Sequence, residues 1–359
     1  MKIAIAGGGN IGTQFAVHCA AKGHDVIVYT SVPGLYNGHL SIVDDKGQVT
    51  LEGSIKEATD DPKRAFSDAE LIFVTVPANL MEKLSDIIYA NAPSETLIGI
   101  IPGSGGGECV FRKCLERGNT IFGLQRVPSV ARLTEKGKTV RCTGYRDDLY
   151  VSALPRLRSS YCTELIEGIF DIKSIPIPDY LNLTLTPSNP ILHTSRLSTM
   201  FKNWKAGKVY EKAPLFYEEW NDDASARLIA ADDEVQAVCR ALPEFDLKYV
   251  KSLKDHYESY SVEEMTKKIS SIAAFQGIGS PMVKTEGGWI PDLHSRYFTA
   301  DFSYGLTIIR QAAGFAGVHT PVIDDMLNWY RSIAVEKDEF RFGAHGITDR
   351  DGFVGFYEG

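Results

Sequence analysis

Short apolar runs alternate with segments of helical spacing through the first half of the chain. The apolar runs lie at residues 2–6, 25–30, 71–76 and 96–101, and helix-patterned segments such as 13–22 and 80–90 separate them. Apolar runs of this length without strict alternation are typical of parallel strands that are buried on both faces. The repeating order of strand, helix and strand therefore predicts a Rossmann-like, doubly wound parallel sheet.

The second half has a helical pattern instead. A proline-punctuated stretch at 175–190 precedes it. Asp222 and Asp223 could cap a helix whose apolar positions recur every three or four residues. Ser261 and Glu264 fit a capping box, and Thr320-Pro321 fits a helix start. We predict an α/β nucleotide-binding domain over residues 1–180 and an all-α substrate and catalytic domain over 181–359.

Composition and charge narrow the classes of function. The chain has 359 residues, with 38 Lys and Arg against 46 Asp and Glu, so its net charge is −8. No dense basic run is present to bind a phosphate backbone, and no apolar stretch reaches the ~20 residues of a spanning helix. Six cysteines are scattered without a CxxC pair. We expect no nucleic-acid or membrane partner, no metal site, and reduced thiols in a cytoplasmic enzyme.

The glycine loop that follows the first predicted strand indicates nucleotide binding. Its sequence is Gly7-Gly8-Gly9-Asn10-Ile11-Gly12. Gly7 would allow the tight turn, Gly9 the approach of a pyrophosphate, and Gly12 the close packing of helix on strand. The free amides of the following helix would face the phosphates. The alternative is a glycine-rich turn that holds no ligand.

The end of the second predicted strand bears on the choice between NAD and NADP. An NAD site usually has Asp or Glu there to bind the ribose 2′-hydroxyl. This chain has Thr30 and Ser31 instead. Hydroxyls tolerate a 2′-phosphate, which favours NADP, but no arginine follows immediately, so NAD stays open. Thr30 and Ser31 could also serve only as turn residues.

Two clusters in the second half could supply acid–base chemistry. Asn189-Pro190 is typical of a helix cap and first helical residue, which would place His193 in the first turn. Arg296 could hold a carboxylate through two parallel hydrogen bonds, and Asp301 could orient a histidine. Position alone allows the plainer alternatives of a structural histidine and a surface salt bridge.

Read together, these pieces give the chain a resemblance to the octopine/nopaline (opine) dehydrogenase family. The general matches are GGGNIG, VTVPAN (74–79) and TPVIDDMLNW (320–329), with IIPGSGGGE (100–108) and LQRVPSVAR (124–132) between them. The specific ones are SNPILHTSR (188–196) and SRYFTADFSYGL (295–306). The resemblance implies a helical domain like that of 6-phosphogluconate dehydrogenase, which closes over an NAD or NADP cofactor.

The resemblance also implies roles for individual residues. His193 corresponds to the catalytic histidine, Asp301 to its carboxylate partner, and Arg296 to the arginine that holds a 2-oxo acid. Asn189 corresponds to a residue that shapes the same pocket. The resemblance further assigns cofactor contacts to Asn10, Ile11, Val76 and Pro77. The chain departs from the commoner family pattern directly after Asp301, where Phe-Ser replaces an apolar-Pro step, so the start of the following helix is uncertain.

The reaction implied by the resemblance is reductive condensation of a 2-oxo acid with the amino group of an amino acid. Its partners are therefore small molecules, and a homodimer is an open alternative to a monomer. A reductase of the same architecture that uses Lys202 or Lys205 is one rival. A nucleotide-binding sensor without turnover is another, and condensation with a larger amine to make a metallophore is a third.

Overall fold

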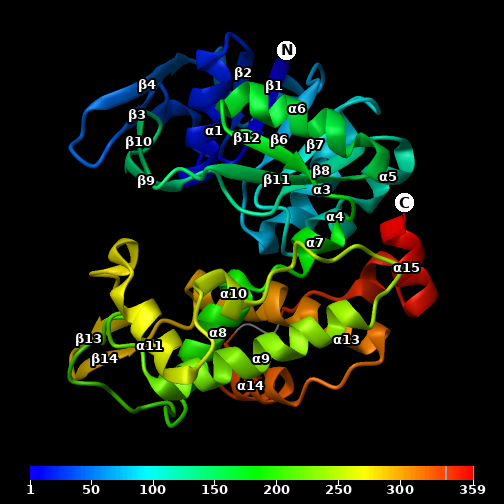
Figure 1. Ribbon diagram of the computed structural model, residues 1–359. Coiled ribbons are helices and arrows are strands. Elements are labelled where there is room, and N and C mark those ends of the chain that lie inside the picture. Colours follow the sequence, from blue (N-terminus) through cyan, green and yellow to red (C-terminus); the bar gives the residue numbers. More distant parts are fainter. Residues whose placement is uncertain (336–337, 359) are drawn as a thin grey trace. The chain divides into compact units, whose positions relative to one another are not determined.

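The computed structural model describes residues 1–335 and 338–358, which group into two compact units (Figure 1). The first unit holds Met1–Thr184 and the chain end from Gly355 on, and the second holds Leu185–Val354. The expected division at residue 180 thus differs by four residues, because the short buried helix at 181–184 groups with the first unit. No helix in the described part of the chain is long and apolar enough to cross a membrane.

The main sheet of the first unit has eight strands in the order β12-β11-β8-β7-β6-β1-β2-β5. All neighbouring strands are parallel except β8 and β11, which pair antiparallel. The strands are β1 (Lys2–Ala6), β2 (Asp25–Tyr29), β5 (Glu57–Thr59), β6 (Leu71–Val74), β7 (Leu97–Ile100), β8 (Thr120–Leu124), β11 (Asp148–Leu154) and β12 (Lys173–Pro176). The sequence prediction of a doubly wound parallel sheet is confirmed, with an antiparallel pair near one edge.

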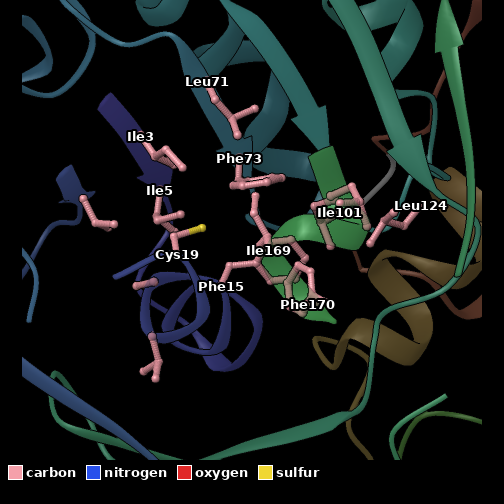
Figure 2. Packing of buried hydrophobic residues seen from close by; sticks show 14 of the residues in the cluster. Ile3, Ile5, Phe15, Cys19, Leu71, Phe73, Ile101, Leu124, Ile169 and Phe170 are labelled. Carbon is pink, nitrogen blue, oxygen red and sulfur yellow. The ribbon is translucent and has the colours of Figure 1, made fainter. Parts of the chain in front are cut away.

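The apolar runs form strands because both faces of the sheet are covered. Figure 2 shows Ile3, Ile5, Leu71 and Phe73 packed with Phe15 of the first helix. The ring of Phe15 lies 4.9 Å from that of Phe73 and 4.7 Å from that of Phe170, both edge-on. The intervening strand positions are equally buried on the opposite face. This two-sided burial accounts for runs without polar alternation.

The helices of the first unit connect these strands. They are α1 (Asn10–Ala21), α2 (Pro62–Phe66), α3 (Met81–Asn91), α4 (Gly107–Val110), α5 (Arg112–Arg117), α6 (Ser159–Phe170) and α7 (Leu181–Thr184), with 3₁₀ turns η1 (Pro33–Leu35), η2 (Ala78–Leu80) and η3 (Arg156–Arg158). Helix α1 begins three residues earlier than its apolar pattern predicts, directly in the glycine loop. The six cysteines are unpaired and five of them are buried.

A second sheet in the first unit has no counterpart in the sequence prediction. It has the order β4-β3-β10-β9 and comprises β3 (His39–Val43), β4 (Val49–Ser54), β9 (Val130–Glu135) and β10 (Thr139–Thr143). Its two hairpins join through the parallel pairing of β3 with β10, about a hundred residues apart in the chain. The sheet packs on α1, where a Cβ on Gly53 would lie 2.8 Å from the Val17 carbonyl oxygen.

The second unit is helical, as predicted, with one added two-stranded hairpin. Its helices are α8 (Ser188–Met200), α9 (Asp222–Arg240), α10 (Leu253–Tyr257), α11 (Val262–Ser271), α12 (Arg296–Thr299), α13 (Thr307–Ala316), α14 (Pro321–Ile333) and the start of α15 (Arg350–Glu358). Shorter elements are η4 (Ala273–Phe275), the π-helix η5 (Asp301–Leu306), η6 (Phe342–His345), β13 (Met282–Thr285) and β14 (Gly288–Pro291).

The predicted helix starts are largely confirmed. Ser261 and Glu264 form the capping box of α11, and Pro321 is the first residue of α14. Helix α9 differs: Asn221, rather than an aspartate, accepts the hydrogen bond from the Ala224 amide. Asp222 instead occupies the first turn, where its negative charge lies near the positive end of the helix dipole and stabilises the helix.

Asp232 of α9 is a fully buried carboxyl that makes the stability of the second unit depend on pH. Its Oδ2 accepts the Leu253 amide at 2.7 Å, while Oδ1 has no partner among the described residues. Burial raises its pKa from 3.8 to about 7. Between these values the folded chain keeps a proton that the unfolded chain releases, so the stability that protonation provides falls as the pH rises from 4 to 7.

We therefore expect Asp232→Asn to be more stable than wild type at pH 8, by about 1–3 kcal/mol, because the neutral amide keeps an oxygen for Leu253. At pH 4, where the carboxyl binds a proton in the folded chain and in much of the unfolded chain, the gain should nearly vanish. Thermal unfolding at the two pH values measures this difference. The matched control is Asp233→Asn, which removes a partly exposed carboxylate paired with Lys254. An equal gain for Asp232→Asn at both pH values would contradict the assignment.

Candidate functional site

The glycine loop has the backbone geometry of a cradle for a phosphate. Gly7 has a φ of 117°, which side-chain-bearing residues rarely adopt. A Cβ on Gly12 would lie 1.7 Å from the Gly7 carbonyl oxygen, so only glycine lets α1 pack this closely on β1. A Cβ on Gly9 would meet no atom within 4 Å, so the backbone there faces open space. The loop therefore packs closely against the protein at Gly7 and Gly12, and its backbone at Gly9 is open.

The start of α1 leaves its first amides available for an anion. Gly9 is the N-cap, no side chain caps the helix, and its first turn has no acidic residue. Such an N-terminus favours a bound phosphate through its amides and dipole. Val76 lies beside the loop, 3.0 Å from a Cβ built on Gly7, and the exposed Pro77 follows it at the carboxyl end of β6. These residues fit a dinucleotide.

Two other predicted cofactor contacts are engaged within the first unit. Asn10 Oδ1 accepts the Leu133 amide of β9 at 2.8 Å, so this side chain ties α1 to the second sheet. Ile11 is half-buried against the hydrophobic core. A cofactor contact from either residue would therefore use its backbone amide at the helix start. Cofactor roles for both residues stay predictions.

The segment after β2 contains the predicted Thr30 and Ser31 and also Tyr36, directly after η1, which the sequence prediction missed. Thr30 Oγ1 accepts the Val32 amide at 3.4 Å, so Thr30 acts as a turn residue, and Ser31 is exposed. The Tyr36 hydroxyl donates to the Gly8 carbonyl oxygen at 3.4 Å, and a Cβ on Gly8 would lie 2.1 Å from it. Burial raises the pKa of Tyr36, so the hydroxyl stays protonated beside the loop.

In the second unit, His193 and Asp301 form a close pair although 108 residues separate them. His193 Nδ1 lies 2.7 Å from Asp301 Oδ2. The histidine side chain is 5% exposed and the aspartate side chain 16%. An ionised carboxylate only accepts hydrogen bonds, so Nδ1 carries the proton and Nε2 is left as an acceptor. The arrangement is that of a histidine general base steadied by a carboxylate.

Helix α8 carries His193, but not in the first turn as predicted. The helix begins at Ser188, and the Ile191 amide donates to the Pro187 carbonyl oxygen. Pro190 is therefore the third helical residue, which costs nothing because the first amides of a helix have no partner within it. His193 lies in the second turn and is buried, whereas Asn189 is exposed.

Asp301 is the first residue of the π-helix η5, which leads directly into α13. The uncertain start after Asp301 is thus explained: Phe302-Ser303 continue a helix of wider turns, a form frequent at functional sites. A Cβ on Gly305 would lie 2.8 Å from Pro190 Cγ. Gly305 therefore lets η5 pack against the start of α8, and this packing holds Asp301 close to His193.

The second ring nitrogen of His193 also has a partner, one that the sequence gave no reason to select. The Tyr217 hydroxyl lies 2.9 Å from Nε2. Tyr217 is 5% exposed, and its ring stacks on that of Phe275 at 4.2 Å. Burial is the main cause that raises the pKa of Tyr217, so the phenol remains protonated and donates to Nε2.

Buried Arg196, one turn after His193 on α8, fixes the segment that carries Tyr217. Its guanidinium donates to the carbonyl oxygens of Phe216 at 3.0 Å and Glu219 at 2.6 Å. It also lies over the Trp220 ring, 5.7 Å from its centroid. Burial lowers the pKa of Arg196 to about 10, which still leaves it charged near neutral pH. One helix thus positions both the imidazole and the phenol.

Two models of known protein families match two parts of this chain. Residues 176–334 match the family model described as NAD/NADP octopine/nopaline dehydrogenase, alpha-helical domain. The helical half of the chain therefore matches the octopine/nopaline dehydrogenase family. Residues 2–103 match the model of the NAD-dependent glycerol-3-phosphate dehydrogenase N-terminus, so the family domain is joined to an NAD-binding one.

Individual relatives agree with this match. The chain is 29% identical to an opine dehydrogenase of Haliotis discus hannai over 76% of this chain and 71% of that protein. It is 25% identical to the octopine dehydrogenase of Mizuhopecten yessoensis over 92% and 89% of the two chains. A solved structure of octopine dehydrogenase with NADH and L-arginine shares the fold with a TM-score of 0.85, at 22% identity over 99% and 98% of the chains.

Three further predicted residues of this chain are exposed and lie outside the buried pair of His193 and Asp301. Arg296 is the exposed first residue of α12, and its guanidinium lies 5.8 Å from the centre of the Tyr297 ring. The Tyr297 ring also lies 4.5 Å from the ring of His193. Lys202 and Lys205 are exposed beyond the end of α8. The arginine is thus close to the dyad and open to solvent.

Proposed function

We propose that this chain is an opine dehydrogenase that condenses a 2-oxo acid with the amino group of an amino acid, using NAD(P)H. The observation that carries the proposal is the buried pair of His193 and Asp301 within the family's own helical domain. Relatives named opine, tauropine and octopine dehydrogenase support the same reaction type. We therefore infer an oxidoreductase of the class that acts on CH–NH groups, since the product of the condensation contains such a group.

The cofactor residues are proposed on the shape of the glycine loop. Gly7, Gly9 and Gly12 provide the turn, the open approach and the close packing that a pyrophosphate needs. Val76 and Pro77 would line the path of the cofactor beyond β6. NAD(P)H supplies the hydride when it is bound. With no acid at the end of β2 and no arginine directly after it, the pocket suits either cofactor, and we propose NADP as the preferred one.

His193 is proposed as the acid–base group and Asp301 as its orienting partner. The carboxylate holds the proton on Nδ1 and stabilises the imidazolium that forms when Nε2 takes a proton. Asn189 is proposed to shape the pocket at the start of the same helix. Its side chain is exposed and makes no hydrogen bond within the described part of the chain, so it can contact a substrate.

Arg296 is proposed to hold the carboxylate of the 2-oxo acid. A guanidinium can grip a carboxylate with two parallel hydrogen bonds, whereas an ammonium offers only a point charge. We expect Arg296→Lys to raise the KM for the oxo acid by roughly tenfold, about 1.4 kcal/mol, with a smaller change in kcat. Steady-state kinetics with the oxo acid varied would show this split. An unchanged KM would remove Arg296 from the site.

A lysine-dependent 2-oxo or 3-hydroxy acid reductase is the second candidate. It is less favoured because Lys202 and Lys205 are exposed outside any helix, while His193 is buried with two partners. A sensor without turnover would have no use for a buried, oriented imidazole. Condensation of an oxo acid with a larger amine, to make a metallophore, would use the same proposed chemistry.

The proposal is tested by following NADH and NADPH oxidation with pyruvate, 2-oxoglutarate and glyoxylate, each crossed with the common amino acids. We expect oxidation that requires an oxo acid and an amine together. Oxidation with an oxo acid alone would favour the lysine reductase. Cofactor binding without oxidation for every pair would favour the sensor. A homodimer stays a prediction, which light scattering of the purified protein tests.

A further inference from the structure

Both ring nitrogens of His193 are occupied, which poses a question for any acid–base role. Nδ1 faces Asp301 at 2.7 Å and Nε2 faces the Tyr217 hydroxyl at 2.9 Å. Neither nitrogen can touch a substrate while these bonds hold. Either Tyr217 leaves Nε2 when substrate binds, or the proton reaches His193 through the Tyr217 hydroxyl.

The surroundings of Tyr217 argue against its leaving. The ring stacks with that of Phe275, at 4.2 Å and 21°, and lies nearly parallel to that of Trp220, at 6.4 Å and 9°. The backbone on either side is held by Arg196 through the carbonyl oxygens of Phe216 and Glu219. A swing of the phenol would break the stacking and leave the buried hydroxyl without its hydrogen-bond partner, and both changes are unfavourable.

We propose that Tyr217 is a catalytic residue, the group that exchanges protons with the substrates, and that His193 and Asp301 act behind it as a proton relay. This inference rests on the proposed function and adds the residue that meets the reacting atoms. The phenolic oxygen has a lone pair left over from its bond to Nε2. It can therefore accept a proton on one side as its own proton passes to His193 on the other.

The relay serves two steps of the condensation. First, the ammonium of the amino acid gives one proton to the Tyr217 oxygen as the phenolic proton moves to Nε2, leaving a neutral amine and an imidazolium paired with Asp301. The amine attacks the carbonyl carbon, and a proton moves from nitrogen to oxygen to give a carbinolamine. Then Nε2 returns its proton through Tyr217 to the carbinolamine hydroxyl, the C–O bond breaks, water leaves, and the nitrogen lone pair forms the C=N bond.

The proton state of each group suits this path. Tyr217 has a raised pKa, mainly through burial, so a free phenolate is not populated and the hydroxyl acts only by passing a proton in and out together. Between the two steps the transferred proton is held on His193, where Asp301 stabilises the positive charge of the imidazolium. Arg196 is a positioning residue in this scheme, because it acts only through the backbone that carries Tyr217.

The test compares wild type with Tyr217→Phe, which keeps the stacked ring and removes only the hydroxyl. We expect kcat to fall roughly a hundredfold, with little change in NAD(P)H affinity. Mixtures of H₂O and D₂O should give a bowed dependence of kcat on deuterium content for wild type, since two protons move together, and a linear one for the variant. Tyr210→Phe is the matched control, because Tyr210 is a half-buried tyrosine of the same unit outside the site.

A double variant completes the test. Groups that act in series lose their effect together, so His193→Ala/Tyr217→Phe should be no slower than His193→Ala alone. If Tyr217→Phe stays within threefold of wild type, or is faster, Tyr217 is only a displaceable cap and the inference is overturned. Additive losses in the double variant would also overturn it. If the wild-type enzyme fails to oxidise NAD(P)H with every tested pair of oxo acid and amino acid, the proposed function fails instead. The two failures can therefore be told apart.

Discussion

Replacing His193 with alanine should nearly abolish turnover while leaving the cofactor affinity unchanged. The imidazole is the only base within reach of both Asp301 and Tyr217 in the described site, and its loss removes the place where the proton rests. Loss of a positioned acid–base group typically costs 10²–10⁴-fold in rate. The glycine loop belongs to the first unit, so NAD(P)H should bind with an unchanged Kd.

The measurement is kcat by NAD(P)H oxidation and Kd by quenching of protein fluorescence. His319→Ala is the matched control, because His319 is an exposed histidine of the same unit, and it should behave as wild type. A His193→Ala enzyme that keeps a tenth or more of the wild-type kcat would remove the histidine from the mechanism.

Asp301→Asn should be almost as damaging, although it changes only one atom. An asparagine amide can donate to Nδ1, which moves the ring proton to Nε2 and turns that nitrogen from an acceptor into a donor. The imidazolium also loses its counter-charge. In serine protease triads the same exchange costs about 10⁴ in kcat, and we expect a loss of roughly 10³–10⁴ here.

Stability and binding measurements separate this explanation from simple misfolding. Asp301→Asn should keep the wild-type Tm and an unchanged Kd for NAD(P)H, because the exchange alters the position of the ring proton and keeps the shape of the side chain. Asp223→Asn, which alters an exposed aspartate in the first turn of α9, is the control and should keep the wild-type kcat. A loss of kcat accompanied by a matching loss of Tm would mean that Asp301 acts only as a structural residue.

Local patterns in the sequence predicted strands of the main sheet that are buried on both faces. The runs at 2–6 and 71–76 contain β1 and β6, in which every position except Lys2 is buried, and this burial produces the continuous apolar pattern. The second sheet escaped prediction for the opposite reason. Strands such as β4 and β9 are partly exposed and mix polar with apolar residues, and β3 and β10 pair across about a hundred residues.

The candidate site divides in the same way. Glycine spacing is local, so the roles of Gly7 and Gly12 in the turn and the packing could be predicted from it, and the geometry matches. His193 and Asp301 lie 108 residues apart, and only the family resemblance brought them together. Tyr217 stands in no motif. Its place depends on Arg196 holding the neighbouring carbonyl oxygens, a tertiary contact that has no signature in the sequence.

We expect a 2-oxo acid to be reduced only after it has condensed with an amine. NAD(P)H with deuterium at the transferred position of C4 distinguishes this order from direct reduction, when the products are identified by mass spectrometry. One deuterium should appear on the α-carbon of a secondary amine that joins both substrates, and this amine should form in equal amount to the NAD(P)+ released. Deuterium in a 2-hydroxy acid, formed at the same rate without an amino acid, would contradict it.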